Sequence, residues 1–219
     1  MTNKVKRDNP VIILGSGRHA KVLIELIRKS GRKIIGVTDP EKVIGEDCLG
    51  VKVLGPDSKV FEYLPSKLDL VNGVAEFSKK GLRIKITKMM KARGYFFTPV
   101  IHPSALIASN VSLSEGVQIM AGAIIQSGAE IKSSTIINTG AIVDHNCIIN
   151  ENCHIAPGVI LNGSVTIGAN THIGTGTSVI QDIEIGQNCV IAAGSVIFKD
   201  IPSNTKVIQN RTTKLAYIP

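Results

Sequence analysis

The sequence predicts a small α/β domain followed by a parallel β-helix, and three observations lead to this prediction. From Ala105 to Asp200 the chain repeats every six residues without an insertion or a skip. Near the start of the chain, an aliphatic strand, a glycine-rich turn and an amphipathic helix follow one another. Two prolines, Pro99 and Pro103, stand where one pattern replaces the other. We therefore expect domains at residues 1–100 and 101–219.

All sixteen six-residue units share one plan. The third residue is always Ile, Val or Leu, the first is Ala, Val, Ile, Thr, Ser or Cys, and the sixth is Gly, Asn, Ser or Asp. This period fits neither a helix nor a plain strand. It fits a short strand with its first and third residues inward, followed by a turn at a residue tolerant of positive φ. Three units make one triangular coil, and about five coils stack into a solenoid.

The first hundred residues read as a parallel α/β unit of the Rossmann type. An aliphatic strand precedes a helical pattern that stops near Gly31, and a second strand, residues 33–37, leads to Thr38. The expected elements are strands at 11–14, 33–37, 68–71 and 95–97, and helices at about 20–31 and 80–93.

The turn after the first strand carries a motif that binds phosphate in many proteins. Gly15, Gly17 and Ala20 satisfy G-x-G-x-x-A, and Asp39 ends the second strand, where a ribose hydroxyl is held in such folds. A nucleotide-like ligand and a purely structural turn both fit this motif. A complete redox-dinucleotide fold does not, because residues 1–104 are barely half of one.

Composition narrows the class of protein. The net charge is +8, and residues 1–104 hold 20 Lys and Arg against 10 Asp and Glu. Such a half attracts phosphate-bearing ligands, but ordinary solvated surface explains most of the charge, and no nucleic-acid motif accompanies it. We see neither a membrane span nor a secretory signal and expect a cytoplasmic protein. Cys147, Cys153 and Cys189 occupy inward positions, so we interpret them as core residues and expect no metal site.

Histidines stand out within the repeat. His145 is the fifth residue of its unit, at an exposed corner where a neutral imidazole can act as a general base. Asp144 precedes it, and Gly163 lies eighteen residues later, at the same corner one coil further on. His154 and His172 are also eighteen apart and are expected to stack on one outer face. His172 reads as a solvated surface residue. Since His145 and His154 fall on different corners, only a second subunit would bring them into one site.

These residues together resemble the bacterial sugar O/N-acyltransferases, of the sialic-acid O-acetyltransferase and bacillosamine N-acetyltransferase type. The matching segments are 15–22, Asp39, 100–105, 137–145 and 154–158. The resemblance implies a left-handed β-helix, a homotrimer, and acetyl-CoA bound between neighbouring prisms. It implies acetylation of an amino group on a UDP-linked sugar for surface glycan synthesis.

The same resemblance assigns roles to individual residues. His145 corresponds to the general base, with Asp144 as its potential assistant, and His154 and Gly163 correspond to contacts with acetyl-CoA. Gly15, Gly17, His19 and Asp39 fall where the sugar nucleotide binds. Two departures stand out: relatives often carry an acid where this chain has Asn146, and they end in Gly-x-Pro-Ala-Lys where residues 207–214 differ. O-acetylation of a sialic-type sugar and a non-catalytic trimeric nucleotide-binding scaffold are the alternatives.

Overall fold

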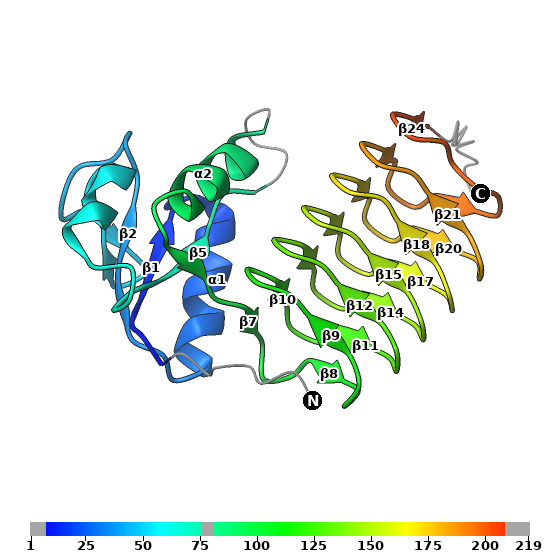
Figure 1. The fold of residues 1–219 in the computed structure, drawn as a ribbon, viewed down its shortest axis with the longest axis horizontal. Coiled ribbons are helices and arrows are strands. Elements are labelled where there is room, and N and C mark those ends of the chain that lie inside the picture. Colours follow the sequence, from blue (N-terminus) through cyan, green and yellow to red (C-terminus); the bar gives the residue numbers. More distant parts are fainter. Residues whose placement is uncertain (1–7, 76–80, 209–219) are drawn as a thin grey trace, which may run out of the picture.

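The computed structural model describes residues 8–75 and 81–208. It contains an α/β part and a solenoid that continues from it (Figure 1). The solenoid is a left-handed parallel β-helix, as the resemblance implied. This handedness is an exception to the usual right-handed crossover.

The α/β part is built on a four-stranded parallel sheet in the order β2-β1-β5-β6. Its strands are β1 (Val11–Leu14), β2 (Ile34–Thr38), β5 (Asp69–Asn72) and β6 (Phe96–Phe97), and its helices are α1 (Arg18–Lys29) and α2 (Leu82–Lys91). These elements match the predicted ones, although Lys80, the predicted start of the second helix, lies outside the described residues. The sequence analysis missed a short hairpin, β3 (Asp47–Cys48) with β4 (Val51–Lys52), and the 3-10 helix η1 (Asp57–Glu62).

The aliphatic run of β1 explains why this sheet is covered on both faces. All four of its residues are buried. Val11 and Ile13 pack with α1, whereas Ile12 and Leu14 pack with residues of α2 and η1. Since successive side chains of a strand point to opposite faces, an uninterrupted apolar strand requires a layer on each side.

The solenoid consists of three parallel sheets, which we call the first, second and third solenoid sheets. Their orders are β24-β22-β19-β16-β13-β10-β7, β23-β20-β17-β14-β11-β8 and β21-β18-β15-β12-β9. The strands are β7 (Val100–Ile101), β8 (Leu106–Ile107), β9 (Ser112–Leu113), β10 (Gln118–Ile119), β11 (Ile124–Ile125), β12 (Glu130–Ile131), β13 (Ile136–Ile137), β14 (Ile142–Val143), β15 (Ile148–Ile149), β16 (His154–Ile155), β17 (Ile160–Leu161), β18 (Thr166–Ile167), β19 (His172–Ile173), β20 (Ser178–Val179), β21 (Glu184–Ile185), β22 (Val190–Ile191), β23 (Val196–Ile197) and β24 (Lys206–Val207).

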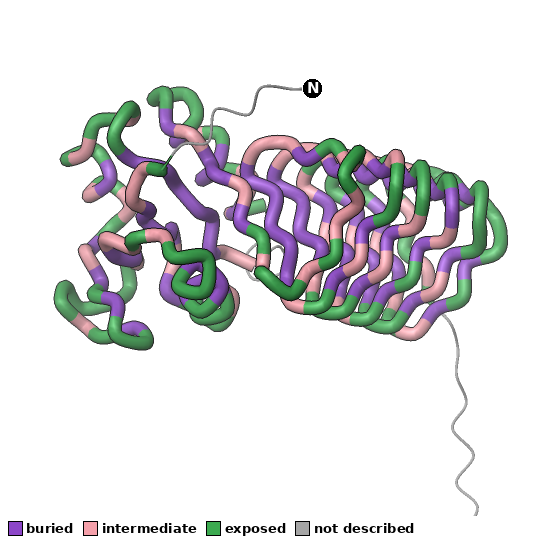
Figure 2. Tube along the Cα trace, turned by 90° about the horizontal axis from the view of Figure 1, so that it is seen from below, coloured by how far each residue is buried: buried purple, intermediate pink, exposed green. Residues whose placement is uncertain are grey.

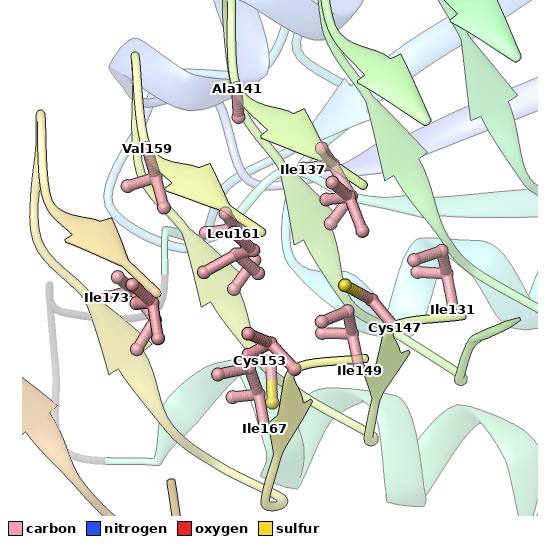
Figure 3. Packing of buried hydrophobic residues seen from close by; sticks show 14 of the residues in the cluster. Ile131, Ile137, Ala141, Cys147, Ile149, Cys153, Val159, Leu161, Ile167 and Ile173 are labelled. Atoms are coloured by element: carbon pink, nitrogen blue, oxygen red, sulfur yellow. The ribbon is translucent and has the colours of Figure 1, made fainter. Parts of the chain in front are cut away.

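The interior of the solenoid confirms the predicted inward positions. First and third residues of the units, such as Val159 with Leu161 and Cys147 with Ile149, form one continuous buried cluster (Figure 3). Buried positions recur from coil to coil along the prism (Figure 2). Sixth residues from Gly116 to Gly194 have positive φ, including Asn146 at 56°. The repeat therefore folds as its sequence indicated, with small turn formers at the corners.

The two parts share a core. Helix α1 lies between the α/β sheet and the first solenoid sheet, so Leu23 and Ile27 belong to the same buried cluster as Val100, Met120 and Ile136. Buried Arg83 on α2 adds a polar link, because its guanidinium donates to the carbonyls of Asn72 and Val74 in the α/β part and of Ser134 in the solenoid. The α/β part is thus seated on the first coils and leaves the later coils uncovered (Figure 1).

Candidate functional site

The glycine turn after β1 opens into a cavity of about 580 Å³. Gly15 has φ of +98° and donates its N–H to the carbonyl of Thr38, so the chain reverses tightly at a residue that needs no side chain. Gly17 caps α1, and a Cβ added there would meet nothing within 4 Å. The cavity is lined by Gly15, Ser16, Gly17, Arg18, His19, Asp39, Pro40, Glu41, Asp57, Gly73, Val74, Ala75, Leu82 and Ile86. The four predicted sugar-nucleotide residues therefore line one pocket.

Asp39 is held in place at the end of β2. Its carboxylate accepts hydrogen bonds from the Ser16 hydroxyl at 2.5 Å and from the Glu41 N–H at 3.0 Å. Partial burial raises the pKa of Asp39, but these hydrogen bonds outweigh that effect and leave it below its usual value. Asp39 is therefore an ionised acceptor facing the pocket. The sequence analysis did not single out Ser16, whose position inside the glycine turn was the available signal.

His19 connects this pocket to the solenoid. Its Nε2 lies 2.7 Å from Oε1 of Gln118 on β10, and the Gln118 amide donates to the carbonyl of Asn72 at 2.8 Å. Since the Asn72 contact fixes the position of the amide nitrogen, Oε1 accepts a hydrogen bond from the Nε2–H of His19. Burial and, to a smaller extent, the nearby Arg83 charge lower the pKa of His19 to about 4, and the hydrogen bond to Gln118 only partly opposes them. His19 is a neutral ring with a fixed tautomer. Buried Gln118 was missed because only the docked domains reveal its partner.

His154 and His172 lie in neighbouring strands of the first solenoid sheet. They are paired in register, with ring centroids 5.0 Å apart in an edge-to-face arrangement. Burial lowers the pKa of His154 to about 3, with smaller contributions from His172, His19 and Arg83. Burial lowers the pKa of His172 to about 4. The predicted stacking is confirmed, whereas the interpretation of His172 as a solvated residue is wrong because ring packing shields it.

His145 and Gly163 form a second constellation, at the corner between the second and third solenoid sheets. His145 is exposed and follows β14, and its backbone carbonyl accepts the Ser164 N–H at 2.8 Å. A Cβ built on Gly163 would lie 2.4 Å from Cε1 and 2.5 Å from Nε2 of His145. The imidazole therefore occupies the space that a side chain at position 163 would need.

The neighbours of His145 differ in how they reach it. Asp144 accepts the backbone N–H of His145 at 2.7 Å through Oδ1, which orients the chain rather than the ring. The Asn146 amide lies 3.4 Å from Nδ1 of His145. Thus Asn146, rather than Asp144, has a side-chain contact with a ring nitrogen of His145.

Within one chain the structure brings together the nucleotide-sized pocket, His19 and His154, on the side of the first solenoid sheet. It keeps His145 and Gly163 at another corner, as the spacing indicated. Only residues 207 and 208 of the divergent segment 207–214 are described, so the expected contacts of its remainder lie outside the described residues.

Comparisons with known proteins match both parts of the chain. Residues 10–84 match the PglD N-terminal domain family, and residues 164–199 match the bacterial transferase hexapeptide family of six repeats. No curated protein sequence matches the chain. The fold and these matches define a hexapeptide-repeat acyltransferase with a small α/β domain at its N-terminus.

Solved structures narrow the family. One variant of perosamine N-acetyltransferase from Caulobacter crescentus, in complex with CoA and GDP-perosamine, is 34% identical, with a TM-score of 0.86 over 92% of this chain and 94% of that one. The acetyltransferase domain of PglB from Neisseria gonorrhoeae, in complex with acetyl coenzyme A, is 31% identical, with a TM-score of 0.86 over 94% and 99%. The chain belongs to the bacterial sugar acyltransferase family.

Proposed function

We propose that this protein transfers an acetyl group from acetyl-CoA to an amino group of a nucleotide-linked sugar, in the synthesis of a surface glycan. The observation that carries this proposal is the nucleotide-sized pocket whose His19 contacts Gln118 on the same solenoid sheet that carries His154. Two relatives more than 30% identical support it: an N-acetyltransferase solved with CoA and an acetyltransferase domain solved with acetyl-CoA. A UDP-linked amino sugar is the acceptor class predicted from the sequence. Because one relative was solved with a GDP-linked sugar, the nucleotide of the acceptor is the first feature to vary in an assay.

The glycine turn is suited to the phosphates of such an acceptor. The first backbone bond within α1 joins Lys21 N–H to the Gly17 carbonyl, so the N–H groups before it are not used inside the helix. Together with the helix dipole they favour an anion, and the open space at Gly17 lets phosphate oxygens approach. Asp39, ionised and held by Ser16, accepts from a ribose hydroxyl. Gly15, Gly17, His19 and Asp39 are the proposed substrate-binding residues.

A homotrimer would complete the site. Second-position residues of the second solenoid sheet form an outward row in register that is apolar at Leu106, Ile124, Ile142, Ile160 and Val196. Leu106 is 66% and Val196 49% exposed. Three copies related by a three-fold axis can cover such rows mutually. We propose that the His145 corner of one subunit meets the His154 face of its neighbour, with acetyl-CoA between them against His154 and Gly163.

Chemistry in this site needs one base and no covalent enzyme intermediate. His145 accepts a proton from the sugar amine as its nitrogen bonds to the acetyl carbonyl carbon. Backbone N–H groups at the corner stabilise the developing oxyanion. The carbon–sulfur bond then breaks, and His145 returns a proton to the sulfur of CoA. Asp144 assists by fixing the backbone of His145. Cys147, two residues away, does not carry the acyl group, because it is buried and burial raises its pKa to about 11.

The state of the cysteines bears on the cellular compartment. Within the described residues, no helix is long and apolar enough to cross a membrane. The four cysteines are free thiols rather than disulfides, which suits a reducing compartment. We propose that the enzyme works in the cytoplasm.

Thiol release from acetyl-CoA tests the proposed function. The protein should release CoA with a UDP- or GDP-linked amino sugar, and mass spectrometry should show one acetyl group on nitrogen. Release with free sialic acid alone, with an ester product, would favour O-acetylation. No release with either kind of acceptor would favour the non-catalytic scaffold. Comparing UDP- and GDP-linked forms of one amino sugar identifies the nucleotide.

A further inference from the structure

Asn138 directly follows β13, and its amide orientation is fixed by a backbone donor. The backbone N–H of Thr139 donates to Oδ1 of Asn138 at 2.8 Å, and the Thr139 hydroxyl lies 3.4 Å from the same oxygen. A backbone N–H can only donate, so the atom facing it must be the amide oxygen. The orientation of the Asn138 amide is therefore set by its own chain.

This orientation determines which ring nitrogen of His154 carries the proton. Nδ2 of Asn138 lies 3.0 Å from Nε2 of His154. An amide NH₂ has no acceptor capacity, so Nε2 must accept and cannot carry a hydrogen. Burial, with the nearby charges, lowers the pKa of His154 to about 3, so the ring is neutral at pH 7. A neutral imidazole with an unprotonated Nε2 carries its hydrogen on Nδ1.

The Nδ1–H group has a further property. It is buried and has no hydrogen-bond partner among the described residues. A buried donor without an acceptor is unfavourable, and such a group in a native structure needs an explanation. The ring of His172 packs edge-to-face on His154 at 5.0 Å and limits its rotation. The ring is thus oriented from two sides and leaves one donor to be satisfied.

We propose that Asn138 is a positioning residue that fixes the Nδ1–H tautomer of His154. The buried Nδ1–H has no acceptor among the described residues, so this tautomer is unfavourable by itself and the Asn138 amide imposes it. The assignment gives His154 a role different from that of His145. With Nε2 occupied by Asn138, His154 does not act as the base.

Histidine-selective ¹⁵N labelling of the full chain tests the tautomer directly. In long-range ¹H–¹⁵N spectra, the ring signals absent from His154→Gln identify His154 and should show a protonated Nδ1 and a bare Nε2. In Asn138→Asp, one carboxylate oxygen keeps the Thr139 N–H and the other can only accept, so the proton should move to Nε2. A bare Nδ1 in the unmodified protein, or an unchanged ring in Asn138→Asp, overturns the assignment.

Kinetics test whether this orientation supports the acetyl-CoA contact proposed for His154, and this test rests on the proposed function. Asn138→Asp and Asn138→Ala should raise the KM for acetyl-CoA about tenfold, the size expected from one lost hydrogen bond, and should change kcat less. Asn150→Ala is the matched control, because Asn150 occupies the same position two units further along the chain and donates to the carbonyl of Ile167. It should leave both the tautomer and KM unchanged. The predicted tautomers with an unaltered KM in both Asn138 variants would overturn the positioning role of Asn138 in acetyl-CoA binding, and the tautomer remains measurable even if no acetyl transfer is found.

Discussion

The imidazole of His145 lies directly over the α-carbon of Gly163, in the volume where a side chain would stand. A Cβ at position 163 would come within 2.5 Å of Nε2, which real contacts do not allow. Gly163 therefore sets the position of the ring by having no side chain. Gly163→Ala keeps the backbone N–H but displaces the imidazole, and we expect kcat to fall at least tenfold while the KM for acetyl-CoA changes less.

A double-mutant cycle separates this steric effect from general damage. In a His145→Ala background there is no ring to displace, so Gly163→Ala should cause little further loss of kcat. Equal losses in both backgrounds would show that Gly163 acts independently of His145, for example through its N–H.

The sugar-nucleotide pocket predicts a selective effect at Gly17. A side chain there meets open space inside the chain, and φ is −70°, so Gly17→Val should fold normally. Its methyl groups should obstruct the phosphates at the start of α1. We expect the KM for the nucleotide sugar to rise about tenfold or more, by loss of a charge-assisted contact, with the KM for acetyl-CoA unchanged. Equal increases in both constants would instead indicate disturbed packing.

Three partly buried histidines predict how stability depends on pH. The folded-state pKa values of His19 and His172 are about 4 and that of His154 about 3, below the ordinary histidine value of 6.5. Between pH 6.5 and about 4 the unfolded chain binds more protons than the folded chain. The contribution of these histidines to the free energy of unfolding is therefore complete above pH 6.5 and is lost as the pH decreases through this window. Each histidine contributes a slope of up to about 1.4 kcal/mol per pH unit.

Urea unfolding at several pH values measures this slope. His172→Gln should reduce it, whereas His145→Gln, at an exposed corner, should not. An identical slope in His172→Gln and the unmodified protein would contradict the burial-based account of this side chain.

The repeat made most of the solenoid predictable, because each coil contacts only its neighbours and an eighteen-residue spacing places Gly163 beside His145 without knowledge of the rest of the fold. The side-chain contacts between segments were not predictable in this way. His19 meets Gln118 only because α1 docks on the first solenoid sheet. Similarly, the shielding of His172 depends on ring packing that a count of positions does not contain.

The shared site predicts subunit complementation. His145→Ala and His154→Ala chains should each form trimers of three 23.3 kDa subunits and be defective alone. When the two are coexpressed, one type of interface combines an intact His145 with an intact His154, so about a quarter of the sites should be restored. Light scattering checks the assembly. A clean monomer at micromolar concentration, or no recovery in mixed trimers, would contradict a site built from two subunits.

The kcat of His145→Ala, measured with the acceptor that the unmodified enzyme acetylates, tests the central claim most directly. General-base catalysis contributes about 10² to 10⁴ in rate, so kcat should fall by that order while the protein remains folded and trimeric. His154→Ala should instead act mainly on the KM for acetyl-CoA, and Asn146→Ala should be mild. A folded His145→Ala trimer with a kcat near that of the unmodified enzyme would remove His145 from the role of the base.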